Sequence, residues 1–347
     1  ITGGTGSFGK AFVEYVLKNY NVNKIVIFSR DELKQFNFQN YLDNKGYNRK
    51  KIRFLIGDVR DQKRLSLAFQ SMDYVIHAAA LKQIPTAEYN PQEVIKTNIN
   101  GAENVIYAAL EQNVKKIIAL STDKAVNPVN LYGATKLVSD KLFIAANNLS
   151  GAKDSRFSVV RYGNVINSRG SVIPFFKEIY KKNKSSLPIT HIDMTRFFIE
   201  VEKGVEFVIN SFKRMHGGEI FIPKLFSIKI VDIAKALDSK IKINIVGIRP
   251  GEKLHEILCQ KDESHLTLEF KDHYIIKPTI GLDIKNNYKI SNTGEKGKDV
   301  SVNFEYVSSN NTMLKITLMW HLIHLENIFG KNFISPSANS TPHFSYS

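Results

Sequence analysis

Blocks of apolar residues alternate with amphipathic stretches along the first half of the chain. Between residues 8 and 20, apolar side chains recur every three or four positions, which predicts a helix with one face on a core. Residues 24–28 form a short apolar run with the length of a buried strand. The same succession then repeats, with strands predicted at 52–56, 74–80, 117–120 and 157–161 and helices between them. Because these strands lack polar alternation, we expect an α/β fold with a doubly wound parallel sheet covered by helices on both faces.

The pattern changes near residue 164. Loops are predicted to dominate at 168–171 and 187–196, around a helix near 205–212, and a strand at 219–222 is expected to return to the main sheet. We therefore expect a first domain (1–163), a smaller lobe interleaved with it (164–306) and a divergent tail (307–347). In the tail, the apolar stretch 313–329 is either a subunit-contact helix or sequence unrelated to the fold. Residues 335–347, rich in Ser, Pro and Asn, are expected to be disordered.

The charge balance indicates an anionic partner. The 347 residues include 48 Lys and Arg against 33 Asp and Glu, giving a net charge of +15. Such a field attracts anions. The basic residues are scattered, however, and the sequence has no helix-turn-helix, zinc-finger or RNA-recognition pattern. We therefore expect a phosphorylated small molecule as the partner and no nucleic acid.

Other bulk features concern location and chemistry. Cys259 is the only cysteine, which excludes an internal disulfide, fits a reducing cytoplasm and indicates an inert, partly buried thiol. No apolar run reaches the roughly 18 residues of a membrane span, and no signal peptide precedes the fold, so we predict no membrane partner. We also predict no metal site. The chain opens where a first strand should be ending, so we expect that strand to be truncated.

A glycine-rich loop opens the chain. Gly3, Gly6 and Gly9 are spaced three residues apart, and the helical pattern follows at once. Glycine lets the backbone turn tightly and approach a pyrophosphate, which the N-terminus of the helix then faces. A strand of suitable length comes next, so we predict a Rossmann dinucleotide site. The other loop residues assigned to it are Thr5, Ser7 and Phe8.

Residues after the next strands select the dinucleotide. Ser29, Arg30 and Lys34 stand where an acidic residue would bind the ribose of NAD, and their hydroxyl and cations favour the 2′-phosphate of NADP. Asp31 argues against NADP unless it caps the following helix. Asp58 either binds the adenine amino group or is a turn residue. The remaining cofactor contacts expected at strand ends are Val59, Ala78 and Ala79.

Residues 121–136 carry the candidate chemistry. Tyr132 and Lys136 lie one helical turn apart, so both side chains project from the same face. A neighbouring ammonium favours the phenolate of a tyrosine, and this pairing suits hydride chemistry at a sugar or alcohol carbon. Asp123 and Lys124 add an acid and a base that simple alcohol oxidation does not need. The alternative, that Tyr132 and Lys136 are exposed helix residues, is less favoured because a strand and this acid-base pair precede them.

With these motifs in place, the chain resembles the extended short-chain dehydrogenases/reductases. Among them it is most similar to the configuration-inverting UDP-N-acetylglucosamine 4,6-dehydratases. The resemblance covers residues 1 to about 306, and Asn167 departs from it by standing where a glycine is usual. Beyond the glycine loop and the Tyr132–Lys136 pair, it rests on segments 29–35, 77–83, 121–124, 161–164, 193–197 and 249–253.

The resemblance implies a reaction without net oxidation. NADP⁺ takes a hydride from C4 of the sugar while Tyr132 accepts the hydroxyl proton. Lys124 then removes the C5 proton, Asp123 protonates the departing C6 oxygen, and the hydride returns to C6. Reprotonation of C5 on its opposite face inverts that carbon. For Lys124 to act as a base its pKa must be lowered, which we expect from the nearby Lys136 and the nicotinamide cation.

Further contacts follow from the resemblance alone. Arg249 corresponds to a diphosphate clamp, since a guanidinium can bind phosphate oxygens bidentately, and a surface ion pair is the alternative for each arginine. Lys82, Asn164, Tyr132 and Lys136 are expected to contact the cofactor as well. The residues implied to bind UDP-N-acetylglucosamine are Lys82, Thr122, Asn164, Arg169, Thr195, Arg196, Arg249 and Glu252. The family also suggests a homo-oligomer, a hexamer, that supplies 6-deoxy amino sugars for surface glycoconjugates.

Two alternatives remain open at this point. A UDP-sugar 4-epimerase or 4-reductase would have the same fold, and the reductase would consume NADPH. A non-enzymatic NADP-binding sensor belongs to another class, and such proteins usually lose the tyrosine-lysine pair that this chain retains.

Overall fold

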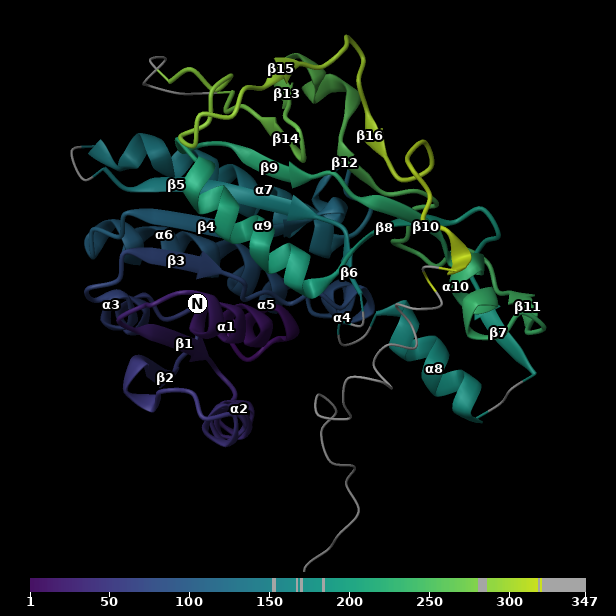
Figure 1. Cartoon of the computed structure of the whole chain (residues 1–347), viewed down its shortest axis with the longest axis horizontal. Coiled ribbons are helices and arrows are strands. Elements are labelled where there is room, and N and C mark those ends of the chain that lie inside the picture. Colours follow the sequence, from purple (N-terminus) through teal and green to yellow (C-terminus); the bar gives the residue numbers. More distant parts are fainter. Residues whose placement is uncertain are drawn as a thin grey trace, which may run out of the picture.

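A mixed sheet forms the centre of the computed structural model, which describes residues 1–151, 154–166, 168, 171–182, 185–279, 286–317 and 319 (Figure 1). Four parallel strands form one side of it in the order β3 (Tyr74–His77), β4 (Lys116–Thr122), β5 (Arg156–Tyr162) and β9 (Ile220–Pro223). Antiparallel strands β14 (His273–Ile276), β13 (Thr267–Glu269) and β15 (Lys298–Asp299) extend it. The expected parallel core is therefore confirmed, including the return of residues 219–222 to it.

Residues 1 and 2 connect this sheet to a second parallel pair, β1 (Ile25–Ser29) and β2 (Ile52–Ile56). Thr2 forms parallel bridges to Phe28 of β1 and to His77 of β3. Its backbone N–H donates to the Ile76 carbonyl at 3.0 Å, and the Phe28 N–H donates to the Ile1 carbonyl at 2.9 Å. The first-strand position is thus occupied by only these residues, and the strand pattern continues across it.

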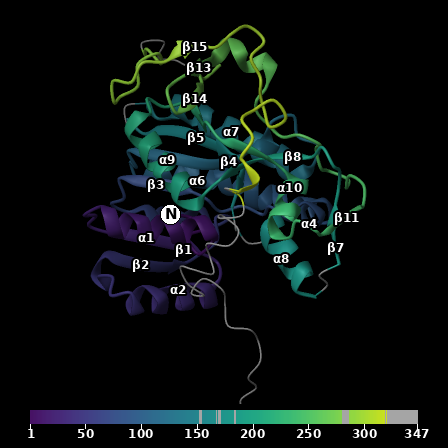
Figure 2. The ribbon, with the colours of Figure 1, turned by 45° about the vertical axis from the view of Figure 1, so that its right-hand side comes forward.

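Helices cover both faces of the sheet, because each presents an apolar stripe to it. On one face, α1 (Ser7–Asn19), α2 (Glu32–Asn44) and α9 (Val201–Arg214) share a core with β1 and β2. On the other, α3 (Gln62–Phe69), α6 (Gly101–Glu111) and α7 (Leu131–Ala145) pack on β3, β4 and β5. Figure 2 shows α9 crossing in front of the central strands. Shorter helices α4 (Ile84–Tyr89), α5 (Pro91–Ile95) and the π-helix Lys96–Asn100 lead into α6.

A second lobe has its own core, which contains Ile173, Phe176, Leu187 and Ile233. It combines α8 (Val172–Lys182) and α10 (Ile230–Leu237) with the parallel pair β7 (Ser186–Ile189) and β11 (Lys242–Ile245). A three-stranded sheet links it to the first domain: β6 (Asn164–Val165), β8 (Thr195–Ile199) and β10 (Phe226–Lys229). Figures 1 and 2 place α8, α10, β7 and β11 together beside the main sheet.

The expectation that loops dominate after residue 164 is wrong. Residues 172–182 are helical, and their buried Ile173 and Phe176 have the three-residue spacing of an amphipathic helix. Strands β7 and β8 occupy parts of 187–196 but are only four and five residues long, too short for their period to stand out. Strands this short are defined by their partners in the sheet rather than by their own sequence.

The segment around the start of the predicted tail contacts both cores. Strand β16 (Tyr306–Val307) pairs with β12 (Ile257–Cys259), Met313 bridges to Ser227 and Met319 is buried. The expectations for most of 313–329 and for 335–347 fall outside the described residues. Cys259 is a buried free thiol, and burial raises its pKa to about 11, as an inert thiol requires. Among the helices of the described ranges, none has both the length and the apolar character to cross a membrane.

Candidate functional site

The glycine loop lies against the ends of two strands with its backbone bare. Gly3 has a φ of +65°, and a Cβ on it would approach the Ala79 nitrogen to 2.8 Å. A Cβ on Gly9 would come within 2.5 Å of Gly4 Cα, where only backbone could give way. Gly6 precedes α1, and no side chain in the described part of the chain caps this helix. The open N–H groups and tight backbone fit a pyrophosphate, as the sequence predicts for a dinucleotide site.

The neighbouring strand ends present both cations and carboxylates. Arg30 is half exposed, with Nη1 3.5 Å from Asp58 Oδ2. Asp31 accepts the Lys34 N–H at 2.9 Å and caps α2, which confirms the capping alternative for this residue. Asp58 accepts the Arg60 N–H at 3.0 Å, as a turn residue does, and forms an ion pair with the Arg60 guanidinium. Burial would raise the pKa of Asp58, but its bonds with Arg60 lower the pKa overall.

Two other predicted cofactor residues are engaged within the protein. Ser29 accepts a hydrogen bond from the Gln35 amide at 3.1 Å, and the Val59 side chain is buried. The Val59 carbonyl accepts a hydrogen bond from the Asn104 amide at 3.0 Å, while Ala78 and Ala79 lie directly beside Gly3.

The catalytic candidates meet where β4 ends. Asp123 follows Thr122 in a short 3₁₀ turn (Asp123–Ala125), and α7 begins at Leu131 after its cap Asn130. Gly133 lets α7 approach this turn, since a Cβ there would lie 2.2 Å from the Lys124 carbonyl oxygen. The close approach brings the predicted phenol, hydroxyl, carboxylate and amine together.

A short series of contacts joins these groups. Thr122 Oγ1 donates to Asp123 Oδ1 at 2.9 Å, and Lys124 Nζ donates to the same oxygen at 2.9 Å. The Lys124 ammonium and the Thr122 hydroxyl both act to lower the pKa of the Tyr132 phenol. Lys124 Nζ also lies 3.5 Å from Asn164 Oδ1, one of the predicted substrate residues.

Glu256 completes the cluster and was missed in the sequence. Its carboxylate is buried, with Oε1 3.4 Å from Lys124 Nζ and 3.7 Å from Arg196 Nε, and with Oε2 3.5 Å from Lys253 Nζ. Burial raises the pKa of Glu256, but the three cations lower it overall. No spacing rule relates positions 124 and 256; the only available signal was that Glu256 follows segment 249–253 by three residues.

The charge states differ from those expected. Burial lowers the pKa of Lys124, but the carboxylates of Asp123 and Glu256 outweigh burial and raise that pKa above its usual range. The pKa of Lys124 is raised rather than lowered, so the expectation that Lys136 depresses it is wrong for the protein without bound cofactor. Burial also raises the pKa of Tyr132 to about 12, and the cation that opposes this effect is Lys124.

Lys136 belongs to a separate buried network behind the site. Burial lowers the pKa of Lys136, while the Asp140 carboxylate counteracts this effect. Asp140 accepts from Ser121 Oγ at 2.8 Å and from Arg161 Nη2 at 3.4 Å. Arg161 is fully buried and also donates to the Leu258 carbonyl at 3.0 Å. Neither Asp140 nor Arg161 was singled out as a site residue from the sequence.

The predicted substrate residues are divided between two environments. Desolvation and then the Lys124 ammonium lower the pKa of Lys82, whose side chain remains exposed. Arg249 is exposed and 3.9 Å from Glu252, a loose ion pair. The loop that carries them docks on the first domain, because Asn130 Nδ2 donates to the Gly251 carbonyl at 2.7 Å. Arg169 lies outside the described residues.

Thr195 and Arg196 are turned toward the protein itself. The Thr195 hydroxyl is 2.8 Å from His255 Nδ1 and 2.7 Å from Ser308 Oγ. Arg196 donates to the carbonyls of Thr195, Lys253 and Leu254 at 2.7, 3.0 and 3.1 Å. In this arrangement both residues hold segment 253–256 and thereby position Glu256.

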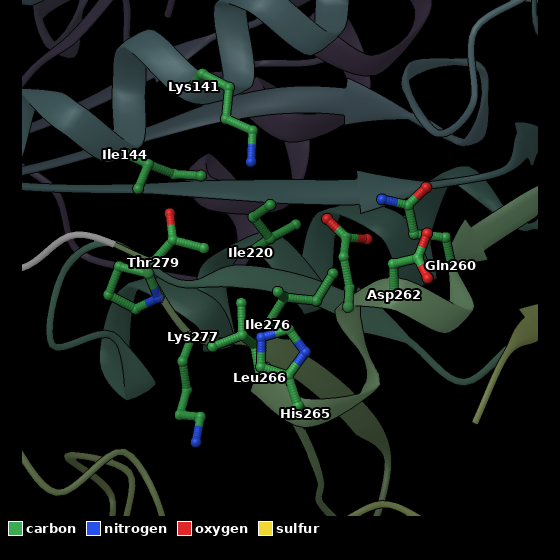
Figure 3. Close-up of a pocket in the computed structure, with 12 residues that line it drawn as sticks. Lys141, Ile144, Ile220, Gln260, Asp262, His265, Leu266, Ile276, Lys277 and Thr279 are labelled. Atoms are coloured by element: carbon green, nitrogen blue, oxygen red, sulfur yellow. The ribbon is translucent and has the colours of Figure 1, made fainter. Parts of the chain in front are cut away.

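A separate cavity of about 170 Å³ lies beside the C-terminal half of α7 (Figure 3). Lys141 and Ile144 of α7 form one wall, opposite His265, Leu266 and Lys277. None of the residues predicted to act on substrate or cofactor lines this cavity, so we do not assign the predicted chemistry to it.

Comparisons with known proteins support this description. Residues 1–278 match the model of a family described as polysaccharide biosynthesis protein. A UDP-N-acetylglucosamine 4,6-dehydratase (inverting) of Campylobacter jejuni is 58% identical over 312 residues, 90% of this chain and 92% of that protein. A UDP-glucose 4-epimerase of Rickettsia conorii is 43% identical over 91% of this chain and 92% of its own length.

Solved structures agree on the architecture. The crystal structure of Pen from Bacillus thuringiensis superposes with a TM-score of 0.82 at 35% identity, covering 94% of this chain and 97% of that one. A dTDP-glucose 4,6-dehydratase of Streptomyces venezuelae, with a TM-score of 0.63 and 18% identity, covers 73% of this chain and 85% of its own and shares the fold alone. The chain therefore belongs to the polysaccharide biosynthesis protein family and has the Rossmann-type fold of extended short-chain dehydrogenases/reductases.

Proposed function

We propose that this protein is a hydro-lyase, a UDP-N-acetylglucosamine 4,6-dehydratase that inverts C5. The observation that carries the proposal is the contact between Asp123 and Lys124, which lie 2.9 Å apart and whose charges both act on the pKa of the Tyr132 phenol. Oxidation of an alcohol needs the phenol alone, whereas elimination of water needs a further base and acid beside it. The relative from Campylobacter jejuni carries the corresponding name at 58% identity.

Each side chain of the cluster has one proposed task. Tyr132 accepts the O4 proton, Asp123 protonates the departing C6 oxygen and Lys124 removes the C5 proton. Burial raises the pKa of Asp123 more than the Lys124 ammonium lowers it, which suits a general acid. Protonation of Asp123 removes one of the two carboxylates that stabilise the Lys124 ammonium, and so makes Lys124 a better base. Bound NADP would supply the hydride acceptor for C4 and the hydride donor for C6.

The cofactor we propose is NADP, held on the bare backbone of Gly3, Gly6 and Gly9. Arg30 supports the choice over NAD, because its guanidinium is half exposed and only loosely paired at 3.5 Å with Asp58. Calorimetric titration of wild type and Arg30→Ala with both dinucleotides tests this. We expect the preference for NADP to fall about tenfold in the variant, equivalent to ~1.4 kcal/mol. An unchanged preference would rule out Arg30 as the 2′-phosphate ligand.

For the substrate, we propose that Lys82, Thr122, Asn164, Arg249 and Glu252 contact UDP-N-acetylglucosamine, and we retain Arg169 as a contact on the resemblance alone. Thr195 and Arg196 act indirectly, because they hold segment 253–256 and thereby position Glu256. We also retain the homo-oligomer as a proposal, which light scattering of the purified protein tests.

Product analysis tests the proposed function. Purified protein incubated with UDP-N-acetylglucosamine should give a 4-keto-6-deoxy sugar that has lost one water by mass spectrometry, without consuming added NADPH. The second candidate is a 4-epimerase, supported by the 43% identical relative from Rickettsia conorii. An epimeric product of unchanged mass would favour that candidate and contradict the dehydratase.

A further inference from the structure

Glu256 has a fixed backbone and a buried side chain. Its N–H donates to Ser308 Oγ at 2.9 Å, and its carbonyl accepts the Ser308 N–H at 2.8 Å. Ser308 is itself held, since its hydroxyl lies 2.7 Å from the hydroxyl of Thr195. A carboxylate on so fixed a backbone has a defined position, and Glu256 Oε1 lies 3.4 Å from the Lys124 amine.

The segment that ends in Glu256 is docked beside the catalytic turn. Segment 249–256 begins with the proposed diphosphate ligand, and within it Lys253 Nζ donates to the Val126 carbonyl. Val126 directly follows the turn that carries Asp123 and Lys124. Glu256 therefore joins a segment proposed to bind substrate to the base that acts on that substrate.

Three oxygens surround the Lys124 amine. Asp123 Oδ1 lies 2.9 Å from Nζ, Glu256 Oε1 3.4 Å and Asn164 Oδ1 3.5 Å. An ammonium has three N–H donors for these oxygens, whereas the neutral amine that removes a proton has two N–H groups and one lone pair. A charged oxygen binds an N–H group more strongly than an amide oxygen does. We therefore expect the lone pair on the side of Asn164, a proposed substrate contact.

The two carboxylates that contact Lys124 differ in what happens to them during the proposed reaction. Asp123 gains a proton and then gives it to the C6 oxygen, so its charge changes. Burial raises the pKa of Glu256, but the Lys124 ammonium, followed by Arg196 and Lys253, lowers that pKa overall. Glu256 is therefore ionised throughout the cycle and accepts an N–H from Lys124 in both of its charge states.

We propose that Glu256 is the positioning residue for the base, and that it holds the Lys124 amine with its lone pair toward C5 of the sugar. As Lys124 removes the C5 proton, Nζ gains the third hydrogen of an ammonium, and the electron pair of the C5–H bond passes into the 4-keto sugar as an enolate. Glu256 accepts an N–H before and after this step and exchanges no proton itself. The inference rests on the proposed dehydratase function and adds a residue to it.

Two partial reactions separate positioning of the base from an effect on folding or binding. Oxidation of C4 uses Tyr132 and is followed by the absorbance of the reduced cofactor, whereas C5 proton removal uses Lys124 and is followed in D₂O by NMR of product deuterated at C5. Both rates are measured on the NADP-bound protein at UDP-N-acetylglucosamine concentrations that saturate each variant, so that changes in affinity do not enter. We expect Glu256→Gln to lower C5 deuteration about 100-fold, the scale for a misplaced catalytic group, with C4 oxidation within about threefold of wild type.

Two further variants sharpen this comparison. Glu256→Asp keeps the charge but withdraws it from Lys124 by one methylene, so C5 deuteration should fall about tenfold with C4 oxidation again spared. This variant tests the proposal even if Glu256→Gln does not fold. Glu269 is the matched control, because it pairs with two other lysines at 2.8 and 3.3 Å. Glu269→Gln should leave both rates within about twofold of wild type, as expected for a partly exposed ion pair.

The ratio of the two rates decides the outcome. Equal losses of C4 oxidation and C5 deuteration in Glu256→Gln would show that Glu256 only supports the fold, and would overturn the proposal. C5 deuteration at the wild-type rate in either Glu256 variant would show that Lys124 is positioned without it. Failure of the proposed function is distinguishable, because wild type itself would then give an epimer or no product.

Discussion

Lys124 is the residue whose surroundings matter most for the chemistry. Its amine contacts Asp123 at 2.9 Å and Glu256 at 3.4 Å, so it is held as an ammonium in the resting protein. Sequence reasoning identified Lys124 but gave it cationic neighbours, whereas the structure surrounds it with carboxylates. A lysine in this setting can exchange protons with its partners, and its basicity depends on whether Asp123 carries a proton.

Removal of the Lys124 amine tests its role directly. Lys124→Ala should keep NADP affinity within about twofold, because the glycine loop does not involve this residue, and should lower dehydration at least 100-fold, as loss of a general base does. Fluorescence titration and product NMR measure the two quantities. Lys115→Ala serves as control, since Lys115 is exposed and paired with Asp73. Turnover near the wild-type rate in Lys124→Ala would show that another group removes the C5 proton.

His77 predicts a pH dependence of stability. It is buried with Nδ1 2.9 Å from Thr2 Oγ1, and burial, followed by the charge of Lys136, lowers its pKa to about 3. The unfolded state binds a proton near pH 6.5, so stability is lost as pH falls below that value. Between pH 7 and 5 this loss amounts to about 2 kcal/mol. Urea unfolding should show it in wild type, and a slope of the same size in His77→Gln would contradict the assignment.

At the level of elements, close backbone approaches determine where helices meet the site. Gly133 brings α7 against the Asp123 turn, and Gly9 brings α1 against Gly4. The Gly9 spacing was recognisable in the sequence because a phosphate loop has a known pattern. The Gly133 contact was not, because its partner Lys124 lies in a different element and the approach appears only in the folded chain.

Alanine should therefore weaken cofactor binding at Gly9 and increase the stability of the fold at Gly204. In Gly9→Ala the new methyl meets Gly4 backbone at 2.5 Å, so α1 must move; we expect at least about tenfold weaker NADP binding, since the helix N-terminus is displaced. In Gly204→Ala the nearest atom is Ile199 Cδ1 at 3.8 Å, and helix propensity should stabilise α9 by ~0.5–1 kcal/mol. Dinucleotide titration measures the effect of Gly9→Ala, and thermal unfolding measures the effect of Gly204→Ala. Unchanged NADP affinity in Gly9→Ala would contradict the pyrophosphate cradle.

The buried pair between α7 and β5 predicts a stability coupling. Arg161 Nη2 is 3.4 Å from Asp140 Oδ2, and both side chains are almost fully buried. Arg161→Met removes the guanidinium that faces this buried carboxylate, and the loss of one partner of a buried ion pair typically costs ~3–5 kcal/mol. Adding Asp140→Asn should recover at least half of the loss. Urea unfolding of both single variants and the double variant measures the coupling, and a cost below about 1 kcal/mol for Arg161→Met would show that the pair contributes little.

For the whole molecule, sequence reasoning succeeded where local pattern determines structure. The parallel strands, α1 and the helix that carries Tyr132 and Lys136 follow from residue spacing alone. The cluster around Lys124 could be predicted only in part, since Glu256 reaches it from more than a hundred residues away. Arg196 was predicted to bind substrate, and its bonds to three backbone carbonyls and its contact with Glu256 could not be predicted. Long-range pairing of this kind depends on the fold and leaves no periodic signal.

The most direct test of the account is the fate of C5. We predict that turnover of UDP-N-acetylglucosamine in D₂O, followed by NMR, gives a 4-keto-6-deoxy sugar with deuterium at C5 and inverted configuration there. The hydrogen from C4 should be found on C6. A product with the original C5 configuration, or a C4 epimer that keeps its C5 hydrogen and C6 hydroxyl, would contradict elimination with inversion by Asp123 and Lys124.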